Sequence, residues 1–274
     1  MPSPSPTPDV SESPALSLRI SDAVFRVIDL ETTGLDPSEA GICEVAWEDV
    51  DCRGNSIGLA PHQCLIDPGV PIPPEASAVH HIVEEDVVGA RRFSEVLPRI
   101  EAEVPADFVG DESDRPVVYV AHNAEFEQSF MPSLAPWLCT YRLALHLFPK
   151  LPSHGLQYLR YAIPLAVNLP RTQAVHRAGA DVAVTVPLLT VCLQALAGLE
   201  KPPQTIGELI RFAEAPALLD RVPFKSSNYI RFEDAEYSLL EWIVERHAGG
   251  RDCVHTAAHH LEIRDGRDRE IFGF

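Results

Sequence analysis

The chain has 274 residues and a mass of 30.1 kDa, which is enough for one full-sized domain and a smaller one. Apolar residues make up 46% and charged residues 23%, as in ordinary globular proteins, so a wholly disordered or fibrous chain is excluded. There are 22 Lys and Arg against 40 Asp and Glu, a net charge of −18. Global charge alone therefore argues against a polyanionic partner.

The start of the chain is rich in Ser and Pro and lacks both the basic cluster and the apolar stretch of a secretion signal, so we expect a disordered tail over residues 1–22. The longest apolar run, Val182 to Leu199, is interrupted by Pro187, Thr190 and Gln194, and we expect no membrane span and no membrane partner. Six scattered cysteines without metal-ligand spacing indicate reduced thiols and a cytoplasmic location.

Taken in chain order, buried strands are expected at residues 23–30, 42–50, 63–67 and 116–121, where β-branched and other apolar residues cluster. Turn residues Thr32 to Pro37 join the first two strands. Between the third and fourth strands lie a proline-rich stretch at 68–74, short helices at 84–88 and 94–103, and an acidic loop at 107–114.

After the fourth strand, Asn123 is expected to cap a helix. Further helices are expected at 141–148, at 155–162, within 176–199 (kinked at Pro187), at 206–213 and at 235–247. This order of elements predicts an α/β domain with a mixed central sheet flanked by helices at 23–199. A stiff linker at 200–204 and a small, mainly helical C-terminal module at 205–274 follow.

Local charge differs from the global balance. The 43 residues from Leu138 to Ala180 contain no Asp or Glu but hold Arg142, Lys150, Arg160, Arg171 and Arg177. This distribution fits a basic face for nucleic acid, although a partly buried helical layer would have the same composition.

Two carboxylates at the end of the first strand suggest metal chemistry. Asp29 and Glu31 are two residues apart, so both side chains point to the same side of the strand. Carboxylates that share one space repel each other unless a cation lies between them, and oxygen ligands suit Mg²⁺ or Mn²⁺. A pair of solvated loop acids is the alternative for such a short pattern.

Three longer motifs favour the metal site over a pair of solvated acids. The first is Asp29-Leu30-Glu31-Thr32-Thr33-Gly34, the second is Ala121-His122-Asn123-Ala124-Glu125-Phe126-Glu127, and the third is His176-Arg177-Ala178-Gly179-Ala180-Asp181. In order and spacing they resemble the motifs of the DEDDh 3′ to 5′ exonucleases, which have a ribonuclease H-like fold. The chain departs from the family pattern at Glu127, where the family has Asp, and at His81, where it has Gly.

The resemblance implies a two-ion site in which Asp29, Glu31, Glu127 and Asp181 hold two Mg²⁺ or Mn²⁺ ions. His176 would be the general base, and its five-residue distance from Asp181 places it on a mobile loop before the helix. The extra methylene of Glu127 is the departure most relevant to activity, because Mg²⁺ tolerates misplaced ligands poorly.

The resemblance also implies contacts to a nucleic acid strand from Thr32, Thr33, Gly34, His81, His122, Asn123, Phe126, Arg142 and Arg177. Core packing is the alternative role for Phe126. Tyr158 and Tyr161 are available for stacking with bases. The branch of the family that the chain most resembles degrades DNA, which favours single-stranded DNA or DNA 3′ ends as substrate and a place in DNA repair.

Three other functions stay open at this stage. RNA 3′ ends are an alternative substrate, because nothing in the sequence reads a 2′-hydroxyl group. A decayed site that binds nucleic acid ends, or a protein partner through the C-terminal module, is the second. A proofreading subunit of a polymerase is the third. The module departs from the family's Gly-Lys-x-x-Gly-Lys turn, having Phe224-Lys225-Ser226-Ser227-Asn228-Tyr229 instead, so a phosphate contact there is not expected.

Overall fold

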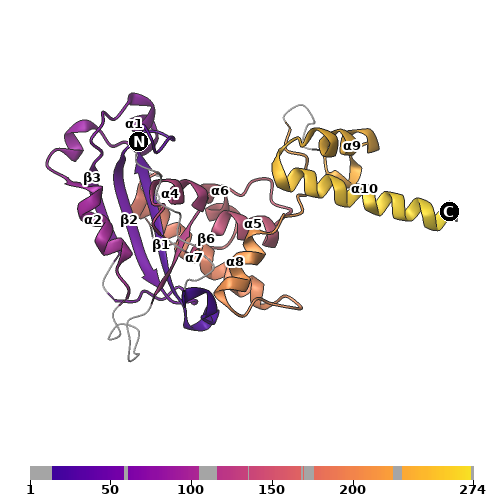
Figure 1. The fold of residues 1–274 in the computed structure, drawn as a ribbon, viewed down its shortest axis with the longest axis horizontal. Helices are drawn as coiled ribbons and strands as arrows, with labels where there is room; N and C mark the ends of the chain where they lie inside the picture. Colours follow the sequence, from indigo (N-terminus) through magenta and orange to yellow (C-terminus); the bar gives the residue numbers. More distant parts are fainter. Residues whose placement is uncertain are drawn as a thin grey trace, which may run out of the picture. The chain divides into compact units, whose positions relative to one another are not determined.

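The computed structural model describes residues 14–58, 61–104, 116–134, 136–167, 169, 176–224 and 230–272 (Figure 1). The chain forms two compact units, one of residues 1–141 and 155–213 and the other of residues 142–154 and 214–274. The predicted acidic loop, Arg171 and most of the 224–229 turn lie outside the described residues.

The first unit is built on a six-stranded mixed sheet in the order β4-β3-β2-β1-β5-β6. Strand β1 runs antiparallel to β2 and parallel to β5, which places it in the middle of the sheet. The strands are β1 (Val24–Thr32), β2 (Ile42–Val50), β3 (His62–Asp67), β4 (Arg91–Arg92), β5 (Val117–Ala121) and β6 (Trp137–Cys139). The predicted mixed sheet flanked by helices is confirmed.

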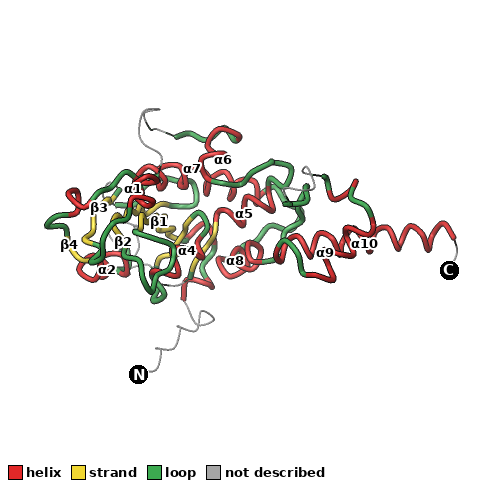
Figure 2. Tube along the Cα trace, turned by 90° about the horizontal axis from the view of Figure 1, so that it is seen from above, coloured by secondary structure: helices red, strands yellow, loops and turns green. Residues whose placement is uncertain are grey.

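Helices are distributed over both units (Figure 2). The first unit contains α1 (Pro74–His80), α2 (Phe93–Glu101), α4 (Ala124–Phe130), α6 (Leu156–Ala162), α7 (Ala178–Ala197) and most of α8 (Ile206–Glu214). Helix α5 (Thr140–Leu147) begins in the first unit and ends in the second, which also holds α9 (Tyr237–Arg246) and α10 (Gly250–Phe272). Short 3₁₀ helices are η2 (Pro14–Ser17), η3 (Ile20–Asp22), η4 (Glu84–Val87) and η6 (Phe232–Asp234).

The alternation of side chains along β1 sends them to two faces of the sheet. Val24, Ile28 and Leu30 belong to a core cluster that includes Val96 and Ile100 of α2. The residues between them point to the opposite face, where α7 packs against β1 and β2. Asp29 and Glu31 therefore share the α7 side of the sheet.

Helix α7 is long and apolar enough to cross a membrane by length and composition alone. Pro187 lies inside it without ending it. Twelve of its side chains are buried within the protein, and its contacts with β1 and β2 account for that burial. From the sequence we took Pro187, Thr190 and Gln194 as evidence against a membrane span. In the structure, the stronger evidence is that α7 packs against the sheet.

Two of the predicted boundaries are wrong. Residues 15–22 are not a tail, because Ala15 is fully buried and the Ile20 amide donates to the Gln204 carbonyl at 3.0 Å. The Ile206 amide donates in turn to the Leu18 carbonyl at 3.0 Å. These backbone pairs hold α8 in the first unit, so residues 200–204 do not separate the compact units and the second one begins near Glu214.

Most predicted elements lie within about two residues of the observed ones. Among the described residues, the α-helices and strands that the sequence did not predict are α1, β4, β6 and α10. Helix α10 is the largest of these. In the second unit it packs against α9 around a core of Val222, Phe232, Leu240, Ile243, Cys253 and Ala257.

Arg142 of α5 belongs to this second unit. Its guanidinium makes a two-point ion pair with Asp252 of α10, and its Nη2 atom donates to the Ala215 carbonyl at 2.7 Å. Asp252 also accepts from the Ala217 amide at 2.8 Å. Arg142 thereby connects α5 to α10 and to the chain segment before it.

Candidate functional site

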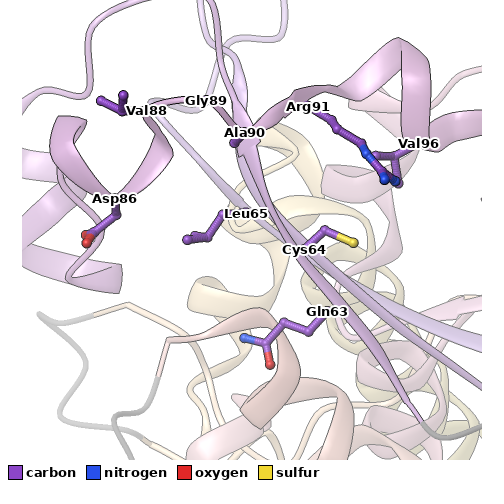
Figure 3. Close-up of a pocket in the computed structure, with 9 residues that line it drawn as sticks. All are labelled: Gln63, Cys64, Leu65, Asp86, Val88, Gly89, Ala90, Arg91 and Val96. Atoms are coloured by element: carbon purple, nitrogen blue, oxygen red, sulfur yellow. The ribbon is translucent and has the colours of Figure 1, made fainter.

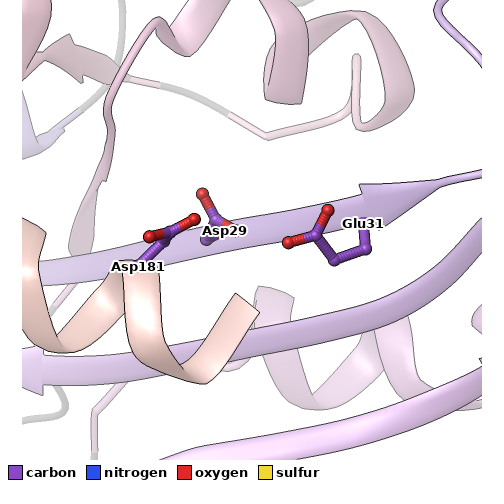
Figure 4. Close-up of side chains that lie close together, drawn as sticks. All are labelled: Asp29, Glu31 and Asp181. Atoms are coloured by element: carbon purple, nitrogen blue, oxygen red, sulfur yellow. The ribbon is translucent and has the colours of Figure 1, made fainter. Parts of the chain in front are cut away.

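Two acids of strand β1 lie close to one acid of helix α7. Asp29 and Glu31 project from β1, and Asp181 projects from the first turn of α7 (Figure 4). One carboxylate oxygen from each lies within 4.8 Å of the others. Glu31 and Asp181 are buried and Asp29 is half-buried. Three like charges this close repel strongly unless protons or a cation neutralise them.

Glu127 is the fourth acid of this region. It lies on α4, is 3% exposed, and its Oε2 atom has no hydrogen-bond partner among the described residues. Burial, together with the charge of Glu31, raises the pKa of Glu127 to about 8, although its own backbone amide acts in the opposite direction. A buried carboxylate oxygen without a partner is costly, so this atom is suited to a ligand that the protein itself does not supply.

The same cause perturbs the other three acids. Burial, followed by the charge of Glu127, raises the pKa of Asp29 well above its ordinary value. Burial and the charge of Asp181 raise the pKa of Glu31 to about 8. Burial also raises the pKa of Asp181. Such a set of acids, in which ionisation is resisted mainly because of burial, has the charge and the donor atoms for Mg²⁺ or Mn²⁺.

Two residues that the motifs did not identify hold the third acid in place. Gln157 of α6 donates from Nε2 to Asp181 Oδ1 at 2.5 Å. Glu44 of β2 accepts from the Ala178 amide at 2.9 Å and so fixes the start of α7. Neither position belongs to a conspicuous sequence pattern, because each acts through a neighbour that is distant in the chain.

His176 lies outside α7, two residues before its first residue, as the sequence predicts. It is exposed and has φ 59°, a left-handed conformation that is uncommon for histidine. Burial raises the pKa of Asp181, and the nearby imidazole of His176 opposes that effect. The side chain can therefore reach the solvent beside the acids.

The loop after β1 is fixed by its own hydrogen bonds. Thr32 and Thr33 are buried; Thr32 Oγ1 donates to the Gly34 carbonyl at 2.7 Å, and Thr33 Oγ1 accepts from the Gly41 amide at 3.0 Å. Gly34 is half-buried, and Leu35 next to it is 84% exposed. The threonine side chains shape this loop, while Gly34 offers backbone to the surface.

His81 is exposed at the end of α1 with φ 61°. That conformation suits the glycine that the family resemblance led us to expect there, since glycine adopts positive φ without strain. The preceding residue, His80, is buried and its Nδ1 accepts from the Ile82 amide at 3.0 Å. His80 therefore supports the turn, and His81 presents its ring to solvent.

The second motif lies where β5 ends and α4 begins. The half-buried His122 is hydrogen-bonded through Nδ1 to Thr140 Oγ1 at 3.0 Å. Asn123 is the N-cap residue of α4, as the sequence predicts, but it has φ 76° and its side chain makes no cap hydrogen bond. Phe126 is half-buried and packs on Phe130 with ring centroids 5.1 Å apart.

The arginines expected at a nucleic acid strand have different surroundings. Arg142 pairs with Asp252 in the second unit, whereas Arg177 pairs with Glu44 in the first. Arg160 of α6 lies over the ring of Tyr161, 5.5 Å from its centroid, and that tyrosine is 73% exposed. Of the basic residues that the sequence analysis names, Arg160 has the surroundings closest to those of a strand contact.

A surface hollow lies elsewhere on the first unit (Figure 3). It is lined by Gln63, Cys64, Leu65, Asp86, Val88, Gly89, Ala90, Arg91 and Val96. These residues come from β3, from η4 and the turn after it, and from β4 and α2. The hollow contains none of the acids and none of the predicted strand contacts.

Comparison with known proteins fits this arrangement of acids. The exonuclease family model (RNase_T) matches residues 27–189, which include all three motifs. The chain belongs to the DEDDh exonuclease family. It is therefore a nuclease that acts on nucleic acid, and its fold is that of the ribonuclease H-like exonucleases.

The branch of the family that the motifs suggested is exodeoxyribonuclease X. The chain is 34% identical over 171 residues to exodeoxyribonuclease 10 of Escherichia coli, covering 61% of this chain and 67% of the relative. It is 28% identical over 204 residues to the DNA polymerase III subunit epsilon of Treponema pallidum, covering 71% and 85%. A solved structure of exonuclease X in complex with 5′ overhanging duplex DNA superposes with a TM-score of 0.55 at 29% identity, covering 69% of this chain and 99% of that one.

Proposed function

We propose that the protein is a 3′ to 5′ exonuclease that hydrolyses phosphodiester bonds at DNA 3′ ends with two Mg²⁺ or Mn²⁺ ions and releases nucleoside monophosphates. The observation that carries this proposal is the convergence of Asp29, Glu31 and Asp181 within 4.8 Å. The Oε2 atom of Glu127, which has no hydrogen-bond partner among the described residues, supports a fourth ligand. DNA is favoured over RNA for two reasons. One similar protein is named an exodeoxyribonuclease, and the similar structure of exonuclease X is a complex with DNA.

Asp29, Glu31, Glu127 and Asp181 would hold the ions. When bound, the ions supply an activated water and stabilise the charge that develops on the leaving 3′ oxygen. Burial opposes the ionisation of these acids, so they would be fully ionised only with a cation beside them. The chain itself contributes the ligand oxygens and brings those of Asp29, Glu31 and Asp181 within 4.8 Å of one another.

The remaining residues handle the proton and the strand. His176 accepts a proton from the attacking water, which suits an exposed imidazole beside Asp181. Gly34 lets the terminal nucleotide approach the backbone. Arg160 and the exposed ring of Tyr161 contact the incoming strand by charge and by stacking.

A nuclease assay tests this proposal. Single-stranded DNA and RNA of one sequence, labelled at the 5′ end, are incubated with Mn²⁺ or with EDTA. We expect a ladder of shortened DNA in Mn²⁺, slower cleavage of RNA, and no cleavage in EDTA. Asp29→Asn should lower the rate by more than the 10–100-fold typical of residues that only support metal ligands.

Asp234→Asn is the matched control, because Asp234 is exposed in the second unit. It should cut like the wild type. Full activity of Asp29→Asn would refute the metal mechanism. Calorimetric titration with Mn²⁺ detects a decayed site, since a protein that binds only nucleic acid ends would hold fewer than two ions.

A proofreading role is the second candidate, because the similar Treponema protein is a polymerase subunit. It predicts stable association with a polymerase and faster removal of mismatched than of matched 3′ ends. Equal rates on mismatched and matched 3′ ends would exclude proofreading and favour the exodeoxyribonuclease function.

A further inference from the structure

Glu44 is a buried carboxylate on the acidic side of the sheet that is not one of the four motif acids. It lies on β2 directly opposite Glu31 of β1 in the sheet register, and its side chain is 1% exposed. Two carboxylates facing each other on neighbouring strands are destabilising unless one is compensated. The surroundings of Glu44 provide that compensation.

Four hydrogen bonds use both oxygens of Glu44. Oε1 accepts from Arg177 Nη2 at 2.6 Å and from Gln63 Nε2 at 2.7 Å. Oε2 accepts from Arg177 Nε at 3.0 Å and from the Ala178 amide at 2.9 Å. With all four contacts made, Glu44 is held by the protein itself, unlike Glu127, whose Oε2 has no partner among the described residues.

These bonds fix the start of α7. Arg177 is the residue before the helix, and its side chain makes no local cap bond. The first amide of α7 therefore donates to Glu44 of strand β2. A negative charge at this helix end is favourable. Asp181 lies in the first turn of that helix, three residues after the amide that Glu44 holds.

Gln63 and Gly179 fit closely at the same point. A Cβ atom at Gly179 would lie 2.4 Å from Gln63 Oε1, so a side chain there would displace the glutamine from Glu44. Gln63 is labelled in Figure 3, on β3 next to β2. The three neighbouring elements β3, β2 and α7 thus meet at one carboxylate.

His176 is affected by the same arrangement. Its positive φ is strained for a residue other than glycine and persists only where the surroundings hold it. Arg177 and Ala178, the two residues that follow His176, are both bound to Glu44 and so hold the backbone on that side of His176. Loosening Glu44 would therefore release the expected base and the expected metal ligand together.

We propose that Glu44, Gln63 and Arg177 form a clamp that positions Asp181 and His176, so that Arg177 is a positioning residue of the nuclease site and not a contact for the DNA backbone. This inference rests on the proposed metal-dependent nuclease function. It assigns to Arg177 a role different from the phosphate contact that the sequence suggested. The clamp acts through the geometry of the α7 start, without touching the substrate.

The test separates metal binding, turnover and DNA affinity in Arg177→Gln and Arg177→Lys. Mn²⁺ binding is measured by calorimetry without DNA, and kcat and KM are measured on 5′-labelled DNA. For Arg177→Gln we expect Mn²⁺ binding and kcat to fall 10–100-fold with KM changed less than about twofold. Arg177→Lys should recover part of both, because one ammonium can still reach Glu44.

Arg92→Gln is the matched control, because Arg92 makes an exposed ion pair with Asp67 in the same unit. It should behave like the wild type in all three measurements. The double variant Glu44→Gln/Arg177→Gln removes both charges, so no unpaired buried carboxylate remains to unfold the protein. It should fold, as judged by circular dichroism, and still show reduced Mn²⁺ binding and kcat.

The outcomes distinguish the clamp from the function beneath it. If the wild type neither binds Mn²⁺ nor cuts DNA, the proposed function itself fails. If the wild type does both and Arg177→Gln binds Mn²⁺ like Arg92→Gln, the clamp alone is refuted. A raised KM with unchanged kcat and Mn²⁺ binding would likewise overturn it and return Arg177 to the DNA backbone.

Discussion

Glu127→Gln is expected to stabilise the metal-free protein strongly at pH 8 and much less at pH 5. The pKa of Glu127 rises from an ordinary value of 4.5 to about 8 in the folded protein. Between these two pH values the folded chain keeps a proton that the unfolded chain has released. The free energy of unfolding of the wild type therefore falls as the pH rises through this window.

The size of the effect follows from the width of the window. About 3.5 pH units at 1.36 kcal/mol per unit gives a ceiling of about 5 kcal/mol for this one group. Local relaxation reduces such penalties, so we expect a gain on the order of 2–5 kcal/mol at pH 8. At pH 5 the folded Glu127 is protonated and the unfolded chain has released only part of a proton, so the expected gain falls below about 1 kcal/mol.

Urea denaturation in EDTA at the two pH values measures this difference. Glu125→Gln is the control, because Glu125 lies on the same helix but is exposed. Mn²⁺ at 100 times its dissociation constant should stabilise the wild type by about 2.7 kcal/mol at pH 8, and Glu127→Gln by less. Equal gains at pH 5 and pH 8, or no gain at pH 8, would refute the view that Glu127 is a buried, unsatisfied acid.

Three further substitutions test other parts of the chain. Glu127→Asp restores the family residue and should cut DNA at least as fast as the wild type; a large loss would mean that the helix has adapted to the longer side chain. Arg26→Gln breaks a buried pair with Asp49 and two bonds to backbone carbonyls, so urea denaturation should show a loss of about 3–5 kcal/mol with kcat of the folded protein unchanged. Arg142→Gln removes the pair with Asp252 and should lower the stability of the second unit by about 1–3 kcal/mol, measured by hydrogen exchange in α10; weaker DNA binding with normal exchange would contradict this.

The site residues that could be predicted from the sequence are those that lie within short motifs, where reactive side chains are a fixed number of residues apart. Asp29 and Glu31 follow from the two-residue period of β1, and Asp181 follows from its motif. Glu44 could not be found in this way. Its importance depends on the pairing of β2 with β1 and on a helix more than 130 positions later.

The missed helices have local causes. Proline-rich residues 68–74 indicated a loop, yet Pro74 is the first residue of α1, where proline is well tolerated. Helix α10 presents Cys253, Ala257 and Leu261 to the core of the second unit. Small side chains at a spacing of four, between charged residues, give a weak amphipathic signal.

The pairing of β1 with β2 shifts register between Glu31 and Thr32, immediately after the second acid. Beyond that shift, the Thr33 amide donates to the Gly41 carbonyl at 2.9 Å, which closes the exposed segment 35–39 on itself. Insertions or deletions inside this closed segment would leave the pleat of β1 in phase. We therefore expect segment 35–39 to differ in length among homologues. It is also the safest place at which to engineer the choice of nucleic acid ends.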